Sequence, residues 1–127
     1  MTDYSKLSDF EINKIVCDVF WPYFEKSSEC KNKTFPQSSS VVYMENGYGG
    51  FSRDYCNNPA DAWPIVVEND IALLPSCGFD WVAISPLTLN GFSSYIDQSL
   101  HGCLQHNDMN PLRAAMIVFL MMQEKKE

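Results

Sequence analysis

Apolar residues near the start of the chain recur every three or four positions, which is the pattern of an amphipathic helix. They are Ile12, Ile15, Val16, Val19, Phe20 and Tyr23. Ser8 and Glu11, three residues apart, predict a capping box where this helix begins. Pro22 has no backbone N–H, so we expect the helix to end or kink there. Residues 26–40 are largely polar and are expected to form a loop.

The middle of the chain alternates between short apolar runs and turn-forming residues. Val41, Val42 and Tyr43 start an extended run, residues 46–50 are a turn signal, and Phe51 resumes the run, which predicts a hairpin. The further expected strands are residues 71–74, 79–85 and, less strongly marked, 92–96. Residues 100–109 are polar and are expected to form a loop.

Two more helices each begin with an asparagine as N-cap and a proline at the first helical position, Asn58-Pro59 and Asn110-Pro111. Pro64 predicts that the first of them is kinked or begins nearer Asp61. The second is apolar on nearly every side from Leu112 to Met122, so we expect it to be buried on more than one face. It is either the centre of the core or an oligomer interface as well.

These elements predict one domain, residues 1–127, of the α+β class: an antiparallel sheet covered by helices, with a buried C-terminal helix. A chain of 127 residues is long enough for one core, and a hydrophobic content of 46% argues against disorder. The apolar excess of the last helix leads us to expect a homo-oligomer, most simply a dimer.

The net charge of −7 disfavours binding to DNA or RNA, because a polymer of phosphates is repelled by an acidic surface. We expect a cytoplasmic protein without a membrane segment. The start of the chain has no basic and apolar leader. The longest apolar stretch, Ala114 to Met122, is well short of the ~20 residues that a span needs. The five cysteines include no C-x-x-C pair, which favours a reducing compartment.

The chain contains two arginines, Arg53 and Arg113, and these are the candidate ligand-binding cations. Arg113 falls at the third position of the last helix, where free backbone N–H groups attract anions and a guanidinium adds a second kind of donor. The alternative is a structural ion pair with Asp61, Asp108 or Glu68. Arg53 is either a ligand residue or an exposed loop cation beside Asp54.

No metal, cofactor or catalytic activity is expected. His101, Cys103 and His106 are metal-ligand types, but their spacing matches no standard zinc pattern. The sequence has no G-x-S-x-G or H-E-x-x-H motif. The stretch Gly47-x-Gly49-Gly50 is not a phosphate loop, because no Lys-Ser/Thr follows it.

Three segments resemble the NinX-like family of small phage proteins: residues 3–14 (DYSKLSDFEINK), 54–64 (DYCNNPADAWP) and 110–120 (NPLRAAMIVFL). More distantly, the order of elements resembles the Thoeris anti-defence family of phage proteins. That resemblance implies sequestration of cyclic ADP-ribose signals in pockets between subunits. It transfers a ligand-binding role to Arg53, Arg113, Phe79, Trp81 and Asn90.

The expected function is therefore that of a phage counter-defence protein. It would bind a small anionic cyclic nucleotide without turnover, with the arginines on phosphates and aromatic rings on the base. The first alternative is a small acidic protein that inhibits a host protein by direct contact. The second, an enzyme acting on a nucleotide, lacks a recognisable acid–base or metal set.

Overall fold

The computed structural model describes residues 2–28, 40–76, 78, 80–85 and 104–126, and it confirms the α+β class. In chain order its elements are η1 (Tyr4–Lys6), α1 (Asp9–Phe20), β1 (Glu25–Ser27), β2 (Val42–Glu45), β3 (Gly50–Arg53), α2 (Pro59–Glu68), β4 (Ala72–Pro75), β5 (Trp81–Ser85), β6 (Leu104–Asp108) and α3 (Pro111–Lys126). None of the helices in these described ranges is long and apolar enough to cross a membrane.

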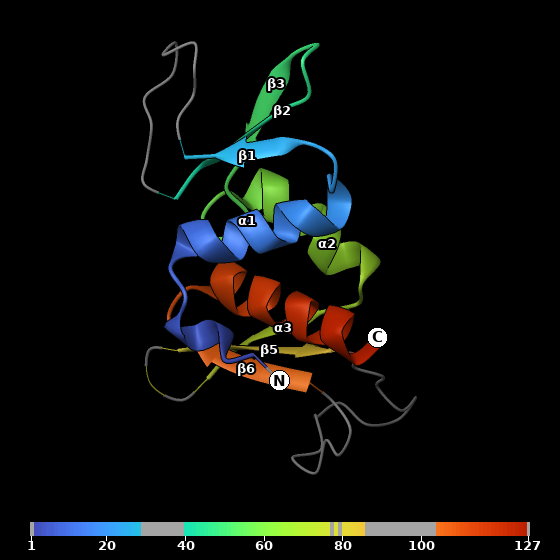
Figure 1. The fold of residues 1–127 in the computed structure, drawn as a ribbon. Coiled ribbons are helices and arrows are strands. Elements are labelled where there is room, and N and C mark those ends of the chain that lie inside the picture. Colours follow the sequence, from blue (N-terminus) through green and yellow to red (C-terminus); the bar gives the residue numbers. More distant parts are fainter. Residues whose placement is uncertain (1, 29–39, 77, 79, 86–103, 127) are drawn as a thin grey trace.

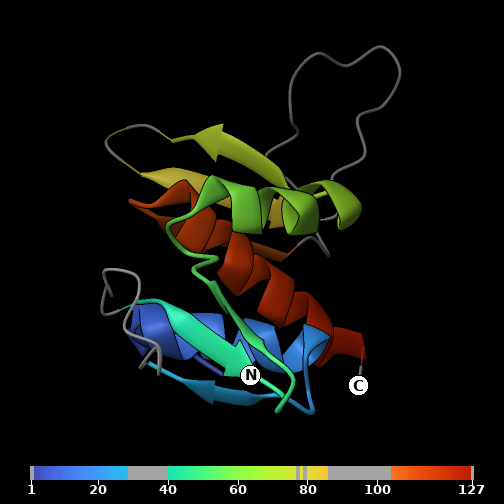
Figure 2. The same ribbon diagram turned by 90° about the horizontal axis from the view of Figure 1, so that it is seen from above.

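Two three-stranded antiparallel sheets stand where one sheet was expected, in the orders β1-β2-β3 and β4-β5-β6. In the first, Val42 lies opposite Arg53 and Glu45 opposite Gly50. The first sheet packs on α1 through β2, and the second packs on α3 through β5 and β6. The helices therefore lie between the two sheets (Figures 1 and 2).

α3 is the centre of the core. Seven consecutive residues, Ala114 to Leu120, are buried, because α3 contacts α1, α2 and the β4-β5-β6 sheet at once. A helix covered on several sides needs apolar residues on several faces, which explains the pattern in the sequence. The apolar residues of α3, which led us to expect an oligomer, are thus buried within a single chain.

The predicted helix starts are confirmed, and two details are corrected. The Ser8–Glu11 capping box is present, and Asn58 caps α2. α1 ends at Phe20, two residues before Pro22, so Tyr23 lies outside the helix and is 95% exposed. α2 begins at Pro59 and continues through Pro64, not nearer Asp61.

The hairpin of β2 and β3 is confirmed, with Gly47 at a φ of +91° in its turn. The loop predicted for residues 26–40 is corrected at its start, since Glu25–Ser27 is strand β1. Most of that segment, and the strand expected at residues 92–96, lie outside the described residues.

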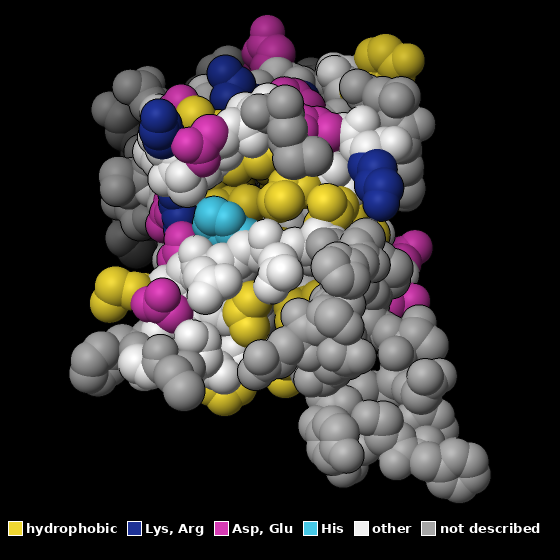
Figure 3. Space-filling view, turned by 90° about the horizontal axis from the view of Figure 1, so that it is seen from below, with side chains coloured by type: hydrophobic (Ala, Val, Ile, Leu, Met, Phe, Trp, Pro, Cys, Tyr) yellow, Lys and Arg dark blue, Asp and Glu magenta, His cyan; other side chains and the backbone are white. Residues whose placement is uncertain are grey.

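The loop predicted over residues 100–109 is wrong for residues 104–108, which form β6. β6 is an edge strand, and its half-buried residues Leu104, His106 and Asp108 alternate with exposed ones. An edge strand can present one face to water, so its exposed and half-buried positions can both be polar. The sequence therefore has no apolar run that would have predicted this strand. Figure 3 shows the molecule from below, where a histidine side chain (cyan) borders exposed apolar side chains (yellow).

Candidate ligand-binding pocket

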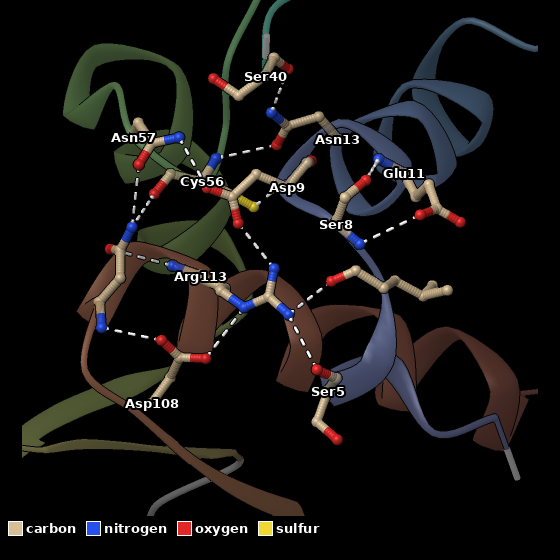
Figure 4. Close-up of polar contacts among 12 residues, drawn as sticks. Ser5, Ser8, Asp9, Glu11, Asn13, Ser40, Cys56, Asn57, Asp108 and Arg113 are labelled. Atoms are coloured by element: carbon tan, nitrogen blue, oxygen red, sulfur yellow. Dashed lines mark hydrogen bonds and ion pairs between the residues drawn. The ribbon is translucent and has the colours of Figure 1, made fainter.

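Arg113 lies in a polar cluster that joins the three segments with the family resemblance, and we call this cluster the polar junction (Figure 4). It consists of Asp9, Asn13, Asp54, Asn57, Asp108, Asn110 and Arg113. The Arg113 Nε donates to Asp108 Oδ2 at 3.0 Å and one terminal nitrogen donates to Asp9 Oδ1 at 2.7 Å. The other terminal nitrogen donates to the carbonyl oxygens of Ser5 and Leu7.

The ion pair that the sequence analysis offered as the alternative for Arg113 is therefore present with Asp108, and Asp9 adds a second. Burial lowers the pKa of Arg113, but the carboxylates of Asp9 and Asp108 outweigh that effect and raise it. The side chain is 14% exposed. Its charge is used to hold η1, α1, β6 and α3 together.

The backbone N–H groups at the start of α3 are also occupied. The Asn110 side-chain oxygen accepts from Leu112 N at 3.0 Å and from Arg113 N at 3.3 Å. Its Nδ2 donates to the Cys56 carbonyl oxygen at 2.7 Å. The helix start that we expected to attract an anion is thus capped from within the chain.

Asn13 completes the junction from α1. It is fully buried, and its Nδ2 donates to Asp54 Oδ1 and to the Ser40 carbonyl oxygen. Its Oδ1 accepts from Cys56 N at 2.9 Å. Every hydrogen-bonding group of this amide except one lone pair is accounted for, so the junction stabilises the fold and offers little to a ligand.

A separate hollow of about 510 Å³ lies between the end of α1, the length of α2 and the second half of α3. This volume falls within the range of small-molecule sites, roughly 300–1,000 Å³. Its walls combine aromatic and aliphatic side chains with a few polar ones. The lining residues are Val19, Phe20, Trp21, Arg53, Tyr55, Ala60, Asp61, Pro64, Ile65, Glu68, Asn69, Phe119 and Gln123.

Arg53 is the cation that lines this pocket. Its guanidinium carbon lies 4.7 Å from the centre of the Phe51 ring, a cation–π contact, and NH1 donates to the Ser52 carbonyl oxygen. The carboxylate of Asp61 lies 3.8 Å from Nε, beyond hydrogen-bonding distance. The side chain is 35% exposed, so Arg53 is held in place yet accessible.

Aromatic rings form the apolar wall. Phe20 and Phe119 are stacked, with centroids 5.6 Å apart and planes 6° apart, and Phe20 is 43% exposed. The Trp21 Nε1 is buried without a hydrogen-bond partner among the described residues. Burial raises the pKa of the neighbouring Tyr55 to about 12.

The described cysteines and histidine do not form a catalytic set in this pocket. Burial raises the pKa of Cys17 to about 12 and raises that of Cys56 as well, so both stay protonated thiols. His106 lies on β6 and does not line the pocket. Within the described ranges no three His, Cys, Asp or Glu side chains are grouped to hold a metal ion.

The predicted ligand residues that the structure describes, Arg53, Arg113 and Trp81, do not lie together in one site. Arg53 lines the pocket, Arg113 belongs to the polar junction, and Trp81 starts β5 in the other sheet. Phe79 and Asn90 lie outside the described residues, as do His101 and Cys103.

Phe20, Trp21 and Phe119 line the pocket, but the sequence pattern did not single them out as ligand-binding residues. The clustering of Phe20 and Trp21 directly before Pro22 was an available signal, because a helix end that carries two adjacent aromatics cannot bury both on one face.

Comparison with family models matches residues 3–123 to the family described as Bacteriophage P22, NinX. The match covers nearly the whole chain, so the protein belongs to this family of phage proteins. No curated protein and no solved structure matches the chain.

Proposed function

We propose that this phage protein is a non-catalytic binding protein that sequesters a small nucleotide signal of the cyclic ADP-ribose type, and so counters a host defence. The observation that carries the proposal is the pocket of about 510 Å³, with its aromatic wall and its accessible Arg53. A base would stack against exposed aromatic surface at Phe20, and a phosphate would accept from the Arg53 guanidinium.

The proposal changes the role first expected for Arg113. Since its donors are engaged by Asp9, Asp108 and two carbonyl oxygens, Arg113 would support binding only by holding α3 in place. Arg53 would carry the charge-assisted contact alone.

The test is isothermal titration calorimetry of the full chain with cyclic ADP-ribose, linear ADP-ribose and cyclic dinucleotides. Arg53→Gln should weaken binding roughly ten- to a hundredfold, the equivalent of losing about 1.5–3 kcal/mol of charge-assisted hydrogen bonding. Lys14→Gln removes the same charge from an exposed site on α1 outside the pocket, and should leave the affinity unchanged.

Mass spectrometry after heat release separates sequestration from turnover. Ligand recovered intact supports sequestration, and breakdown products point to an enzyme. No binding to any of the nucleotides would overturn the proposal.

The alternative of direct inhibition of a host protein is favoured by one observation. Trp63 and Val67, one turn apart on α2, are 57% and 56% exposed on a chain of net charge −7. Such a face could dock on a basic, apolar surface. A host protein captured by wild type and lost with Trp63→Ser would support this alternative.

A further inference from the structure

We infer that the outer edge of β6 is a second binding site, which takes an extended polypeptide segment with apolar and basic side chains from a partner protein. The segment would add a strand to the β4-β5-β6 sheet. None of the β6 residues lines the ligand pocket, so this inference is independent of the proposed nucleotide.

The main-chain groups on the outer side of β6 are available for pairing. β6 pairs with β5 along one side over its five residues, Leu104–Asp108, and is the last strand of its sheet. Among the described residues, no backbone group is hydrogen-bonded to the other side of β6. A row of free N–H and C=O groups at a sheet edge is a template for an added strand.

β6 also lacks residues that commonly block an edge strand. Its sequence, LQHND, contains neither lysine nor proline. The other outer strands in the described ranges are less suited to pairing. β1 has three residues, β4 ends in Pro75, and in β3 the Ser52 carbonyl oxygen already accepts from the Arg53 side chain.

A groove runs along this edge, and η1 forms its opposite wall (Figure 1). The Arg113 guanidinium joins the two walls, because it donates to Asp108 of β6 and to the carbonyl oxygens of Ser5 and Leu7. Seen from below, the surface between the walls is hollowed and shows apolar side chains (Figure 3). Since Arg113 fixes both walls, the groove is formed before a partner binds, which lowers the cost of binding.

The side chains along the groove suit an extended segment. The histidine at its border in Figure 3 is His106, since His101 lies outside the described residues. Leu104 is half-buried on the face of β6 that it shares with His106, and Met109, directly after β6, is 73% exposed. Alternate side chains of a strand point to the same face. Apolar residues at every second position of the segment would therefore contact the hollow, while the others face water.

The charges favour a basic partner segment over a second copy of this chain. Carboxylates outnumber cations by four to two among the charged residues that border the groove or hold its walls. They are Asp3, Asp9, Asp108 and Glu124 against Lys6 and Arg113. β6 contains no lysine or arginine and carries Asp108 itself, so the same strand of a second copy supplies neither. Basic residues on the segment would complement the surplus of carboxylates.

The experiment titrates the full chain with a short synthetic peptide in which valine and lysine alternate. Fluorescence anisotropy of the labelled peptide should show saturable binding, and amide hydrogen exchange should slow at residues 104–108. The same peptide methylated on its backbone nitrogens should bind at least about tenfold more weakly, because it keeps its side chains and loses its N–H donors. A peptide in which valine and glutamate alternate should also bind more weakly.

Asn107→Lys tests the edge itself. Asn107 is exposed on β6, and a lysine there blocks an added strand, so the affinity for the valine–lysine peptide should fall about tenfold. Asn46→Lys is the matched control, because it adds the same charge at an exposed position beside the first sheet and should leave the affinity unchanged. An unchanged urea midpoint shows that each variant is folded.

No binding of the valine–lysine peptide, binding without slowed exchange in β6, or equal binding of the methylated peptide would each overturn the inference. Tighter binding of the valine–glutamate peptide, or an Asn107→Lys variant that binds like the wild type, would do the same. Self-association that Asn107→Lys abolishes would assign this edge to a second copy and would also overturn it.

Discussion

At the residue scale, the two arginines of the chain occupy opposite kinds of environment. Arg113 is 14% exposed and donates to four oxygen atoms, whereas Arg53 is 35% exposed and rests on the Phe51 ring. A guanidinium whose donors are satisfied within the chain contributes to stability. One whose donors remain accessible can bind a ligand.

We predict that Arg113→Lys lowers the free energy of unfolding by about 2–3 kcal/mol, because a lysine ammonium cannot reproduce the fork that joins Asp9 and Asp108 and leaves part of a half-buried network unpaired. Urea denaturation followed by tryptophan fluorescence measures this. Ligand affinity, corrected for the folded fraction, should stay unchanged. A stable variant with lost affinity would return Arg113 to the binding site.

His106 gives the fold a dependence on pH. Burial lowers its pKa below the ordinary 6.5, Asp108 opposes this, and Arg113 adds to it. At His106 the folded state then binds fewer protons than the unfolded state, so the contribution of His106 to stability is constant above about pH 6.5 and is lost as the pH drops through the folded pKa.

We predict that His106→Gln flattens the loss of stability between pH 7 and pH 5. Urea midpoints at the two pH values measure it. His101→Gln, which removes the other histidine, is the control. An unchanged slope in His106→Gln would show that other groups cause the dependence.

At the element scale, local sequence signals predicted where the helices start. Features that depend on contacts between residues far apart in the sequence were not predicted. The Asn58 and Asn110 caps could be predicted from the sequence, because each side-chain oxygen accepts from backbone N–H groups only two or three residues further along the chain. Asp108 was among the partners considered for Arg113, but Asp9 was not, because it lies 104 positions away in the sequence. β6 escaped prediction because an edge strand needs no apolar run. The pocket escaped because three helices meet there only in the folded chain.

The end of α2 is a Schellman motif with an unfavourable residue in it. Ile71 N donates to the Val66 carbonyl oxygen at 3.0 Å and Asp70 N donates to that of Val67 at 3.4 Å. Asp70 therefore has a φ of 54°, the left-handed region, where glycine is preferred.

We predict that Asp70→Gly is more stable than Asp70→Ala by about 1 kcal/mol. Both variants remove the carboxylate, so the difference isolates the backbone conformation. Thermal or urea unfolding of the two variants side by side measures it. Equal stabilities would mean that this helix end relaxes without cost.

At the scale of the whole molecule, α3 no longer explains an oligomer, since Ala114 to Leu120 are covered by the chain itself. The large apolar side chains that remain exposed on helices lie elsewhere, on α2 and at the end of α1. They are Val19, Phe20, Trp63 and Val67, between 40% and 57% exposed. Exposed apolar surface of this kind favours association.

We predict that the protein is a homodimer at high micromolar concentration and that Trp63→Ser shifts it to monomer, because this substitution removes the largest exposed side chain of α2 without disturbing the core. Light scattering coupled to size exclusion measures the mass, and an unchanged urea midpoint for the dissociated variant controls for misfolding. A wild-type protein that stays monomeric would contradict this prediction and would leave the Trp63–Val67 face of α2 free for a host protein.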